Sequence, residues 1–231
     1  MTDFRGFVRA HTRLSPVPLV PEILLHQADE AIALWERTEN ESATRQPPPF
    51  WAFAWAGGQA LARHVLDHPA LVAGREVLDL AAGSGLVAIA AAKAGAAAVT
   101  AVDIDPLSLA AVAANAAANG VTVAAVERDI LDTTPDAAVV LAGDVFYSRA
   151  MAERMMAYFQ RAAAAGALVM VGDPGRAYLP PSGLRRVAAY AVPVVATLED
   201  AEIKQTTVWQ VTLDQAIGPG ATPGVARDGG R

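Results

Sequence analysis

Short apolar runs recur through the middle of the chain, and longer segments with helical spacing lie between them. The runs cover residues 76–80, 99–103, 121–126, 137–142 and 167–171. Apolar runs of this length, bounded by turn residues, are typical of strands, and the Val- and Leu-rich fourth run is typical of a strand buried on both faces. The alternation of strands with helices predicts an α/β domain with five strand–helix units.

The segments between and after these runs predict the other elements. Helices are expected over residues 59–68, 86–98, 107–119, 149–165 and 182–190. Pro106 opens the third of these and Gly120 follows it, as is usual at helix ends. Two further strands, 192–198 and 205–213, flank an acidic turn, so they are expected to form an antiparallel hairpin.

The first 45 residues are expected to form a helical extension rather than a domain, because they are too few to bury a core of their own. Apolar residues at helical spacing predict one helix over residues 21–37, with Pro21 in its first turn. Residues 46–214 then form the main domain. Residues 215–231, rich in Gly and Pro, are expected to be a disordered tail.

The composition narrows the classes of function. The chain has 231 residues, a formal charge of −6 and no cysteine. The negative charge argues against nucleic-acid binding, and the lack of cysteine excludes disulfides and thiolate metal sites. No apolar run reaches membrane-spanning length without a glycine or a charged residue. We therefore expect a cytoplasmic protein that binds no metal, nucleic acid or membrane, and we take it to be a monomer.

Residues 76–105 carry the clearest functional pattern. They read as strand, tight turn, helix, strand and acid, which is a crossover unit with a nucleotide-shaped pocket at the strand tips. Gly83 and Gly85 let the backbone turn sharply and approach a ligand. Asp103 lies 20 residues after Gly83, where a carboxylate can bind both ribose hydroxyls of a nucleoside. The alternative is a glycine-containing turn that binds no ligand.

Asp79 distinguishes between two classes of nucleoside. It lies four residues before Gly83, and a carboxylate there would repel a pyrophosphate but suit a cation. The third glycine of the dinucleotide fingerprint is also absent, because position 88 is alanine. The motif Asp-Leu-Ala-Ala-Gly-Ser-Gly instead matches S-adenosylmethionine (SAM) sites, whose ligand carries an ammonium group. Ala81 replaces the first glycine of that pattern, and an alanine there is expected to need a negative φ.

Two other segments are candidates for the pocket. Residues 50–58 alternate four aromatic residues with alanines and end in Gly57 and Gly58. This predicts a core strand or hydrophobic anchor, an aromatic wall beside a ligand, or both. Asp129 follows the third strand, where an acid can bind an adenine amino group. A solvated loop carboxylate is the alternative for Asp129.

The fourth strand runs into Asp144-Val145-Phe146-Tyr147, at the switch point where open α/β sheets bind ligands. A carboxylate beside aromatic rings suits a cationic amine. At about 4 Å and an effective dielectric of about 20, the attraction is about 4 kcal/mol before desolvation. This chemistry favours lysine as methyl acceptor over adenine or glutamine. Asp144 would orient the amine first and act as a base second; the alternative is that it caps the following helix.

Several segments together resemble the electron transfer flavoprotein β-subunit lysine methyltransferases, a family of seven-strand SAM-dependent protein-lysine methyltransferases. They are residues 20–23, 50–53, 57–61, 77–80, 103–106, 143–147 and 172–176. The last of them reads Gly-Asp-Pro-Gly-Arg. The resemblance implies a Rossmann-like sheet of order 3-2-1-4-5-7-6, with the last strand inserted antiparallel. It also implies SAM as cofactor and the flavoprotein β subunit as substrate, with a ribosomal stalk protein as a further substrate in bacterial members.

The motifs and the resemblance together give the candidate site residues. For the cofactor they are Trp55, Gly58, Asp79, Ala81, Gly83, Gly85, Leu86, Asp103, Ile104, Asp129, Ile130 and Asp144. For catalysis they are Asp144, Phe146 and Tyr147, and for the substrate Asp144, Phe146, Tyr147, Asp173 and Trp209. Tyr147 and Trp209 are expected to wall a lysine channel, with ordinary core packing as the alternative.

Three other interpretations of the chain stay open. One is a small-molecule or amide N-methyltransferase on the same fold. Another is a non-catalytic adaptor of this fold, held to a partner by the aromatic residues of segment 50–55. The last is a nicotinamide dehydrogenase, against which Asp79 argues because it stands where a pyrophosphate would pass.

Overall fold

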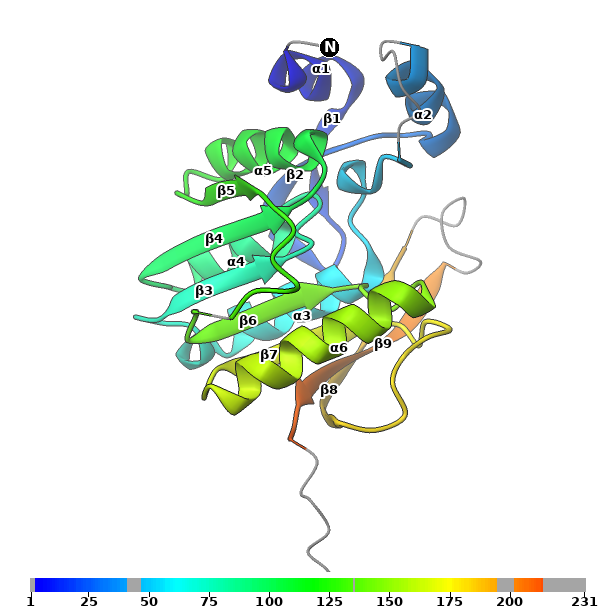
Figure 1. The fold of residues 1–231 in the computed structure, drawn as a ribbon. Helices are drawn as coiled ribbons and strands as arrows, with labels where there is room; N and C mark the ends of the chain where they lie inside the picture. The colour runs from blue at the N-terminus through cyan, green and yellow to red at the C-terminus, as the bar shows by residue number, and fades with distance from the viewer. Residues whose placement is uncertain (1–2, 41–46, 135, 195–201, 214–231) are drawn as a thin grey trace, which may run out of the picture.

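A seven-stranded sheet with helices on both faces forms the body of the molecule (Figure 1). The computed structural model describes residues 3–40, 47–134, 136–194 and 202–213. The strands of the sheet are β3 (Glu76–Leu80), β4 (Ala98–Asp103), β5 (Ala124–Glu127), β6 (Val139–Gly143), β7 (Leu168–Asp173), β8 (Leu184–Pro193) and β9 (Ile203–Val211). Their order is β5-β4-β3-β6-β7-β9-β8, with β9 antiparallel to both its neighbours. Numbered along the chain, this is 3-2-1-4-5-7-6, so the predicted fold is confirmed.

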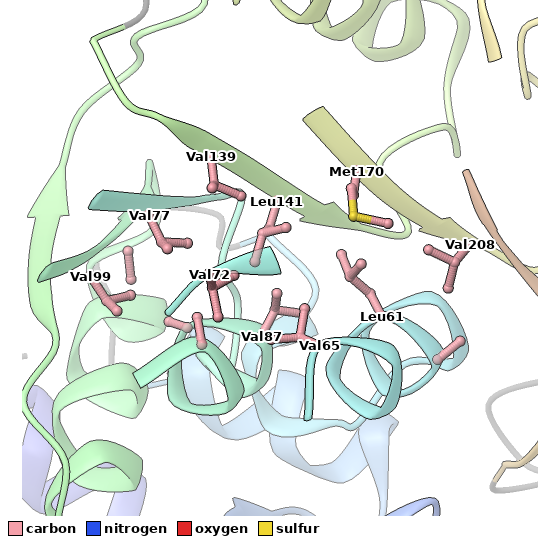
Figure 2. Packing of buried hydrophobic residues seen from close by; sticks show 14 of the residues in the cluster. Leu61, Val65, Val72, Val77, Val87, Val99, Val139, Leu141, Met170 and Val208 are labelled. Carbon is pink, nitrogen blue, oxygen red and sulfur yellow. The ribbon is translucent and has the colours of Figure 1, made fainter. Parts of the chain in front are cut away.

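Two apolar layers hold the helices to the sheet. Helices α3 (Ala56–Asp67), α4 (Leu86–Lys93) and α5 (Pro106–Ala118) cover one face, and α6 (Arg149–Ala164) covers the other. Figure 2 shows the first layer, in which Val77, Val99, Val139, Leu141, Met170 and Val208 of the strands face helical residues that include Leu61 and Val87. Alternate strand residues pack into the second layer against α6, as the two-residue period of a strand requires.

Helix α3 lies so close to the tips of β6 and β7 that only glycine fits at the contact. A Cβ on Gly57 would come within 2.2 Å of the Gly172 carbonyl oxygen, and a Cβ on Gly143 would come within 2.8 Å of the Gly58 Cα. Both distances are far below van der Waals contact, so a side chain there would displace the backbone. The N-terminus of α3 is therefore fixed directly against the strand tips.

The N-terminal segment contains a β-hairpin, so the helix predicted over residues 21–37 is wrong for residues 21–27 and is found only from residue 31 onward. Its elements are α1 (Phe4–His11), β1 (Arg13–Val17), β2 (Val20–Gln27) and α2 (Ala31–Asn40). β1 and β2 pair in an antiparallel two-stranded sheet, and a proline such as Pro21 is as acceptable in an edge strand as at a helix start. Ile23 and Leu25 fit the two-residue period of a strand, and both are buried.

Two asparagines at the C-terminal end of α5 join this hairpin to helix α5 and to the glycine turn. The Leu24 amide donates to Asn119 Oδ1 at 3.0 Å, and the His26 amide donates to Asn115 Oδ1 at 2.7 Å. Asn115 is fully buried, and its Nδ2 donates to the Ser84 carbonyl oxygen in the glycine turn at 2.8 Å. The Asn115 side chain thus forms hydrogen bonds with the backbone of both the hairpin and the glycine turn.

The helix predicted over residues 182–190 is also wrong, because this segment belongs to strand β8. Ala188, Tyr190 and Val192 follow a period of two and pack on the α3 side of the sheet, so pairing with β9 overrides the helix propensity of the alanines. Of the predicted strand 192–198, residues 195–198 lie outside the described part of the chain, as do the tail 215–231 and the domain boundary at 45/46. The expected division into an extension, a main domain and a tail stays a prediction.

Candidate active site

A cavity of about 530 Å³ opens at the carboxyl ends of β3, β4 and β6. This volume is within the usual range of small-molecule sites, about 300–1,000 Å³. The predicted cofactor residues that line it are Trp55, Gly58, Asp79, Ala81, Gly83, Leu86, Asp103, Ile104, Asp129, Ile130 and Asp144, and Tyr147 lines it as well. Residues far apart in the sequence therefore meet where parallel strands end, as the topology of such sheets requires.

Asp103 at the tip of β4 holds the glycine turn and faces the cavity. The Gly83 amide donates to Asp103 Oδ2 at 2.9 Å, and the Asp105 amide donates to Oδ1 at 3.0 Å. A carboxylate oxygen accepts two hydrogen bonds, so each oxygen retains one acceptor position. A Cβ built on Gly83 would have no atom nearer than 4.0 Å beyond its chain neighbours. The open turn and the two acceptor positions fit the diol of a ribose.

Asp79 lies in the cavity wall and also binds the start of helix α4. It is 2% exposed, and its Oδ2 accepts a hydrogen bond from the Ala88 amide at 2.9 Å. Burial raises the pKa of Asp79 well above its usual range, while the Ala88 bond opposes that rise. The carboxylate therefore stabilises the α4 N-terminus, in addition to the predicted contact with a cationic ligand group.

Ala81 adopts a left-handed backbone conformation with φ +55°, so the expectation that alanine needs a negative φ here is wrong. The turn keeps the conformation that a glycine would adopt, because the contacts around it fix the backbone. Gly83 and Gly85 also have positive φ. An L-residue in this region costs about 1–2 kcal/mol, so the turn contains strain.

Replacing Ala81 by glycine should raise the free energy of unfolding by about 0.5–1 kcal/mol. Relief of about 1–2 kcal/mol of backbone strain outweighs the about 0.4–1 kcal/mol lost to the greater entropy of the unfolded chain. Chemical denaturation of the two proteins measures the difference. The matched control is Ala82→Gly, at a neighbour without positive φ, which should lower stability. If both variants are destabilised, position 81 carries no strain.

Asp129 lines the cavity and is held by Arg154 of helix α6. Arg154 Nη1 donates to Asp129 Oδ2 at 2.9 Å, and Arg154 Nη2 donates to Oδ1 at 3.2 Å. The hydrogen bond from Arg154 lowers the pKa of Asp129 below its usual range. The carboxylate is half-exposed, yet it is fixed at the cavity edge by this bidentate pair.

An aromatic rim borders the cavity mouth and consists of Phe50, Trp55 and Tyr147. The ring centroids of Phe50 and Trp55 are 5.9 Å apart, and those of Phe50 and Tyr147 are 5.8 Å apart. Residues 50–52 form a 3-10 turn, so the predicted core strand is wrong. The three rings line the cavity, and their contact with a ligand stays a prediction. Trp51 is buried in the core, which fits the predicted hydrophobic anchor.

Asp144, one residue after β6, is 11% exposed and has φ +60°. Its Oδ2 accepts a hydrogen bond from the Gly58 amide at 2.9 Å, and its Oδ1 accepts from Arg176 Nη2 at 2.6 Å and Nε at 3.1 Å. Burial raises the pKa of Asp144 to about 6, against the opposing charge of Arg176. Asp144 thus caps helix α3, whereas the following helix α6 is capped by Ser148.

Four predicted site residues do not line the cavity. Gly85 is the N-cap of α4, and Phe146 is fully buried in the α6 layer. Asp173 is buried beneath the loop that follows β7, with its Oδ2 lacking a hydrogen-bond partner. Trp209 lies on β9, paired with Val171 rather than with the strand tip.

Other residues in the cavity wall were not predicted. They include Arg128, Met151, Arg154, Met155 and Arg176. The two methionines stand four residues apart in α6, and this spacing is also found in ordinary core packing. Arg176 is different, because it ends the Gly-Asp-Pro-Gly-Arg segment that carries part of the family resemblance.

Two further properties of the described residues concern membranes and metals. No helix in the described ranges has the length and apolar character needed to span a bilayer. Within the same ranges, no three His, Asp or Glu side chains gather in a way that could hold a metal ion.

The chain is similar to methyltransferases in sequence and in structure. The family model described as "Ribosomal protein L11 methyltransferase (PrmA)" matches residues 60–166. The electron transfer flavoprotein beta subunit lysine methyltransferase of Danio rerio is 35% identical over 216 residues, which cover 90% of this chain and 83% of that protein. The protein of the same name from Homo sapiens is 32% identical, with 90% and 81% covered.

A solved structure supports the fold assignment. A putative RNA methyltransferase from Pyrococcus horikoshii superposes with a TM-score of 0.54 at 13% identity, covering 79% of this chain and 98% of that one. The sequence relatives are more specific, because they match nearly the whole chain. The chain therefore belongs to the family of electron transfer flavoprotein β-subunit lysine methyltransferases and is a SAM-dependent methyltransferase.

Proposed function

We propose that this protein methylates lysine side chains of the electron transfer flavoprotein β subunit. The observation that carries the proposal is the position of Asp144, a largely buried carboxylate that lines the cofactor cavity beside the aromatic rim. An opening flanked by aromatic rings, with an acceptor oxygen in the cavity wall, suits a long side chain with a terminal amine. The names of the relatives support the flavoprotein as substrate.

We assign cofactor binding to the acids at the strand tips. When bound, SAM supplies a methyl group on a positively charged sulfur. Asp103 would accept hydrogen bonds from the ribose hydroxyls, and Asp129 would accept one from the adenine amino group. Asp79 would face the ammonium of the methionine moiety. Their positions in the wall of one cavity support these roles.

Asp144 would orient the amine of the substrate. Its Oδ2 accepts one hydrogen bond, from Gly58, and so has capacity for a second from a lysine N–H. The amine must be neutral to attack, although the pKa of a free lysine is about 10.4. The apolar rim favours the neutral form by desolvating the amine. Tyr147 would flank the amine, while Phe146, Asp173 and Trp209 would support the site from outside the cavity.

The pH dependence of kcat/KM should show two ionisations. The free lysine alone gives a rise of about tenfold per pH unit up to about pH 10. Asp144, with a pKa of about 6, offers the amine a charged acceptor only when ionised, so below about pH 6 the slope should steepen to about one hundredfold per unit. Initial rates from pH 5 to 9 measure this. A uniform slope across that range would contradict the prediction that the reaction depends on the ionisation of Asp144 near pH 6.

The substrate assignment is tested with the full chain, SAM and purified flavoprotein β subunit. Mass spectrometry should show mass increases in steps of one methyl group on a lysine peptide. Asp144→Ala should reduce the rate by about 100-fold or more. The control is Asp136→Asn, which should leave the rate unchanged because Asp136 is exposed and lies before β6 rather than after it. Label in a small molecule, or in a ribosomal stalk protein instead of the flavoprotein, would overturn the assignment.

We further propose that the protein acts as a cytoplasmic monomer. The cavity wall is made by one chain, with residues from β3, β4, β6 and α6 all present. The absence of cysteine is compatible with a reducing compartment. Sedimentation of the enzyme at micromolar concentration tests the monomeric state, and fractionation of cells tests the cytoplasmic location.

A further inference from the structure

The turn after β7 brings a guanidinium to the carboxylate at the tip of β6. Asp173 Oδ1 accepts hydrogen bonds from the Gly175 amide at 2.7 Å and from the Arg176 amide at 2.8 Å. Gly175 has φ +86°, which permits this tight turn. The buried end of β7 therefore fixes the main chain from which the Arg176 side chain starts.

The Arg176 side chain is fixed at its other end by two groups. Its Nε and Nη2 both donate to Asp144 Oδ1, at 3.1 and 2.6 Å, and its Cζ lies 5.6 Å from the centre of the Trp55 ring. The side chain is 20% exposed. A guanidinium with a charge-assisted contact on one side and an aromatic ring on the other has little freedom to move away.

The hydrogen bonds to Asp144 leave one position for a substrate. Arg176 takes both acceptor positions of Oδ1, and Gly58 takes one of the two on Oδ2. The remaining position belongs to an oxygen whose charge is already balanced by Arg176. An amine reaching it meets a neutral ion pair rather than an isolated negative charge, and a neutral pair does not favour the ammonium form.

We propose that Arg176 is a positioning residue of the methyl-acceptor site, which holds the Asp144 carboxylate in place and supplies its counter-charge so that the substrate lysine binds as the neutral amine. The inference rests on the proposed function for the identity of the acceptor. The effect of Arg176 on Asp144 does not depend on the proposed function, because it can be measured without any substrate.

Other charges around Asp144 agree with this role. Asp173 lies behind the pair and raises the pKa of Asp144, whereas Arg176 lowers it. The N-terminus of α3 contributes the Gly58 amide. Asp79, Asp103 and Arg128 line the same cavity. On α6, Arg154 is paired with Asp129 and Asp132. Arg176 is thus the cation that directly contacts Asp144 among the described residues.

The first test is a titration of the full chain without substrate. The carboxyl ¹³C signal of Asp144, assigned with Asp144→Asn, reports its ionisation. In Arg176→Gln the midpoint should move to higher pH, because the buried carboxylate loses its counter-charge. Arg176→Lys should shift the midpoint less, because a lysine ammonium keeps the positive charge but not the pair of hydrogen bonds from Nε and Nη2. An unchanged midpoint in Arg176→Gln would overturn the proposal, whatever the enzyme methylates.

The second test is kinetic and uses Arg149→Gln as the matched control. Arg149 also lies over an aromatic ring, that of Tyr178, and is exposed. Arg176→Gln should lower kcat about 10- to 100-fold with KM changed about threefold or less. The acidic limb of its pH profile should move to higher pH. The control should keep the wild-type kcat. Guanidinium at millimolar concentration should restore part of the activity of Arg176→Gly and none of Asp144→Ala.

Two kinetic outcomes contradict the proposal. A rise in KM at constant kcat would mean that Arg176 contacts the substrate instead of positioning Asp144. A wild-type pH profile in a folded Arg176→Gln variant would mean that Asp144 does not need the counter-charge. If no lysine substrate is methylated by the wild type, the proposed function fails, and the titration still decides the role of Arg176.

Discussion

Replacing Asp103 by alanine should weaken SAM binding by at least about 100-fold. Each hydrogen bond to a charged acceptor contributes about 1.5–3 kcal/mol, so two bonds from the ribose hydroxyls contribute about 3–6 kcal/mol, and a factor of ten corresponds to about 1.4 kcal/mol. The variant also loses the acceptor of the Gly83 amide, at 2.9 Å in the wild type. Isothermal titration calorimetry with SAM measures the loss.

Glu127→Ala is the matched control for Asp103. Glu127 stands opposite Asp103 in the β4–β5 register and is exposed, but it does not line the cavity. Removing its charge should change the dissociation constant about twofold or less. Equal weakening by both variants would indicate a long-range charge effect, and undiminished binding by Asp103→Ala would mean that the ribose binds elsewhere.

The second large effect is expected on stability. Gly57→Ala should lower the free energy of unfolding by about 2–4 kcal/mol, because its Cβ would come within 2.2 Å of the Gly172 carbonyl oxygen and 2.6 Å of Asp144 Oδ2. Helix α3 must then move away from the strand tips, which separates the Gly58 amide from Asp144. Denaturant unfolding measures the loss of stability, and methyl transfer should fall with it.

The neighbouring glycine provides the control for this substitution. A Cβ on Gly58 would meet only Leu86 Cδ2, at 3.8 Å, so Gly58→Ala should change stability by about 1 kcal/mol or less. The comparison of two adjacent alanines separates the steric contact from any general effect on the helix. Similar stability of the two variants would show that α3 can shift without cost.

The five parallel strands could be predicted because each is a short apolar run bounded by turn residues, whereas the order of the sheet was implied by the family resemblance. The acids Asp79, Asp103, Asp129 and Asp144 could be assigned to one site because parallel strands end at one edge. Residues 21–27 and 184–190 form strands where helices are predicted, since Pro21 and the alanines around 188 suit a helix equally well when the partner strand is unknown.

The contact between Arg176 and Asp144 could not be read from the sequence. It joins residues 32 positions apart, and it depends on the exact course of two turns, one of them with a positive φ at Asp144. Ala81 shows the same limit, because its backbone conformation is imposed by its surroundings and not by its own preference. Sequence patterns identify which residues share an edge, but they do not determine which side chains pair there.

The asparagine contacts of the N-terminal hairpin have a consequence for biosynthesis. Strand β2 leaves the ribosome almost a hundred residues before Asn115 and Asn119, whose side chains bind its Leu24 and His26 backbone groups. Until α5 has been translated, this edge of the nascent polypeptide can pair with another strand. Because this edge is exposed early and unpaired, we expect a chaperone to act on the hairpin first. Ribosome-bound chains arrested before residue 119 should aggregate more than chains arrested after it.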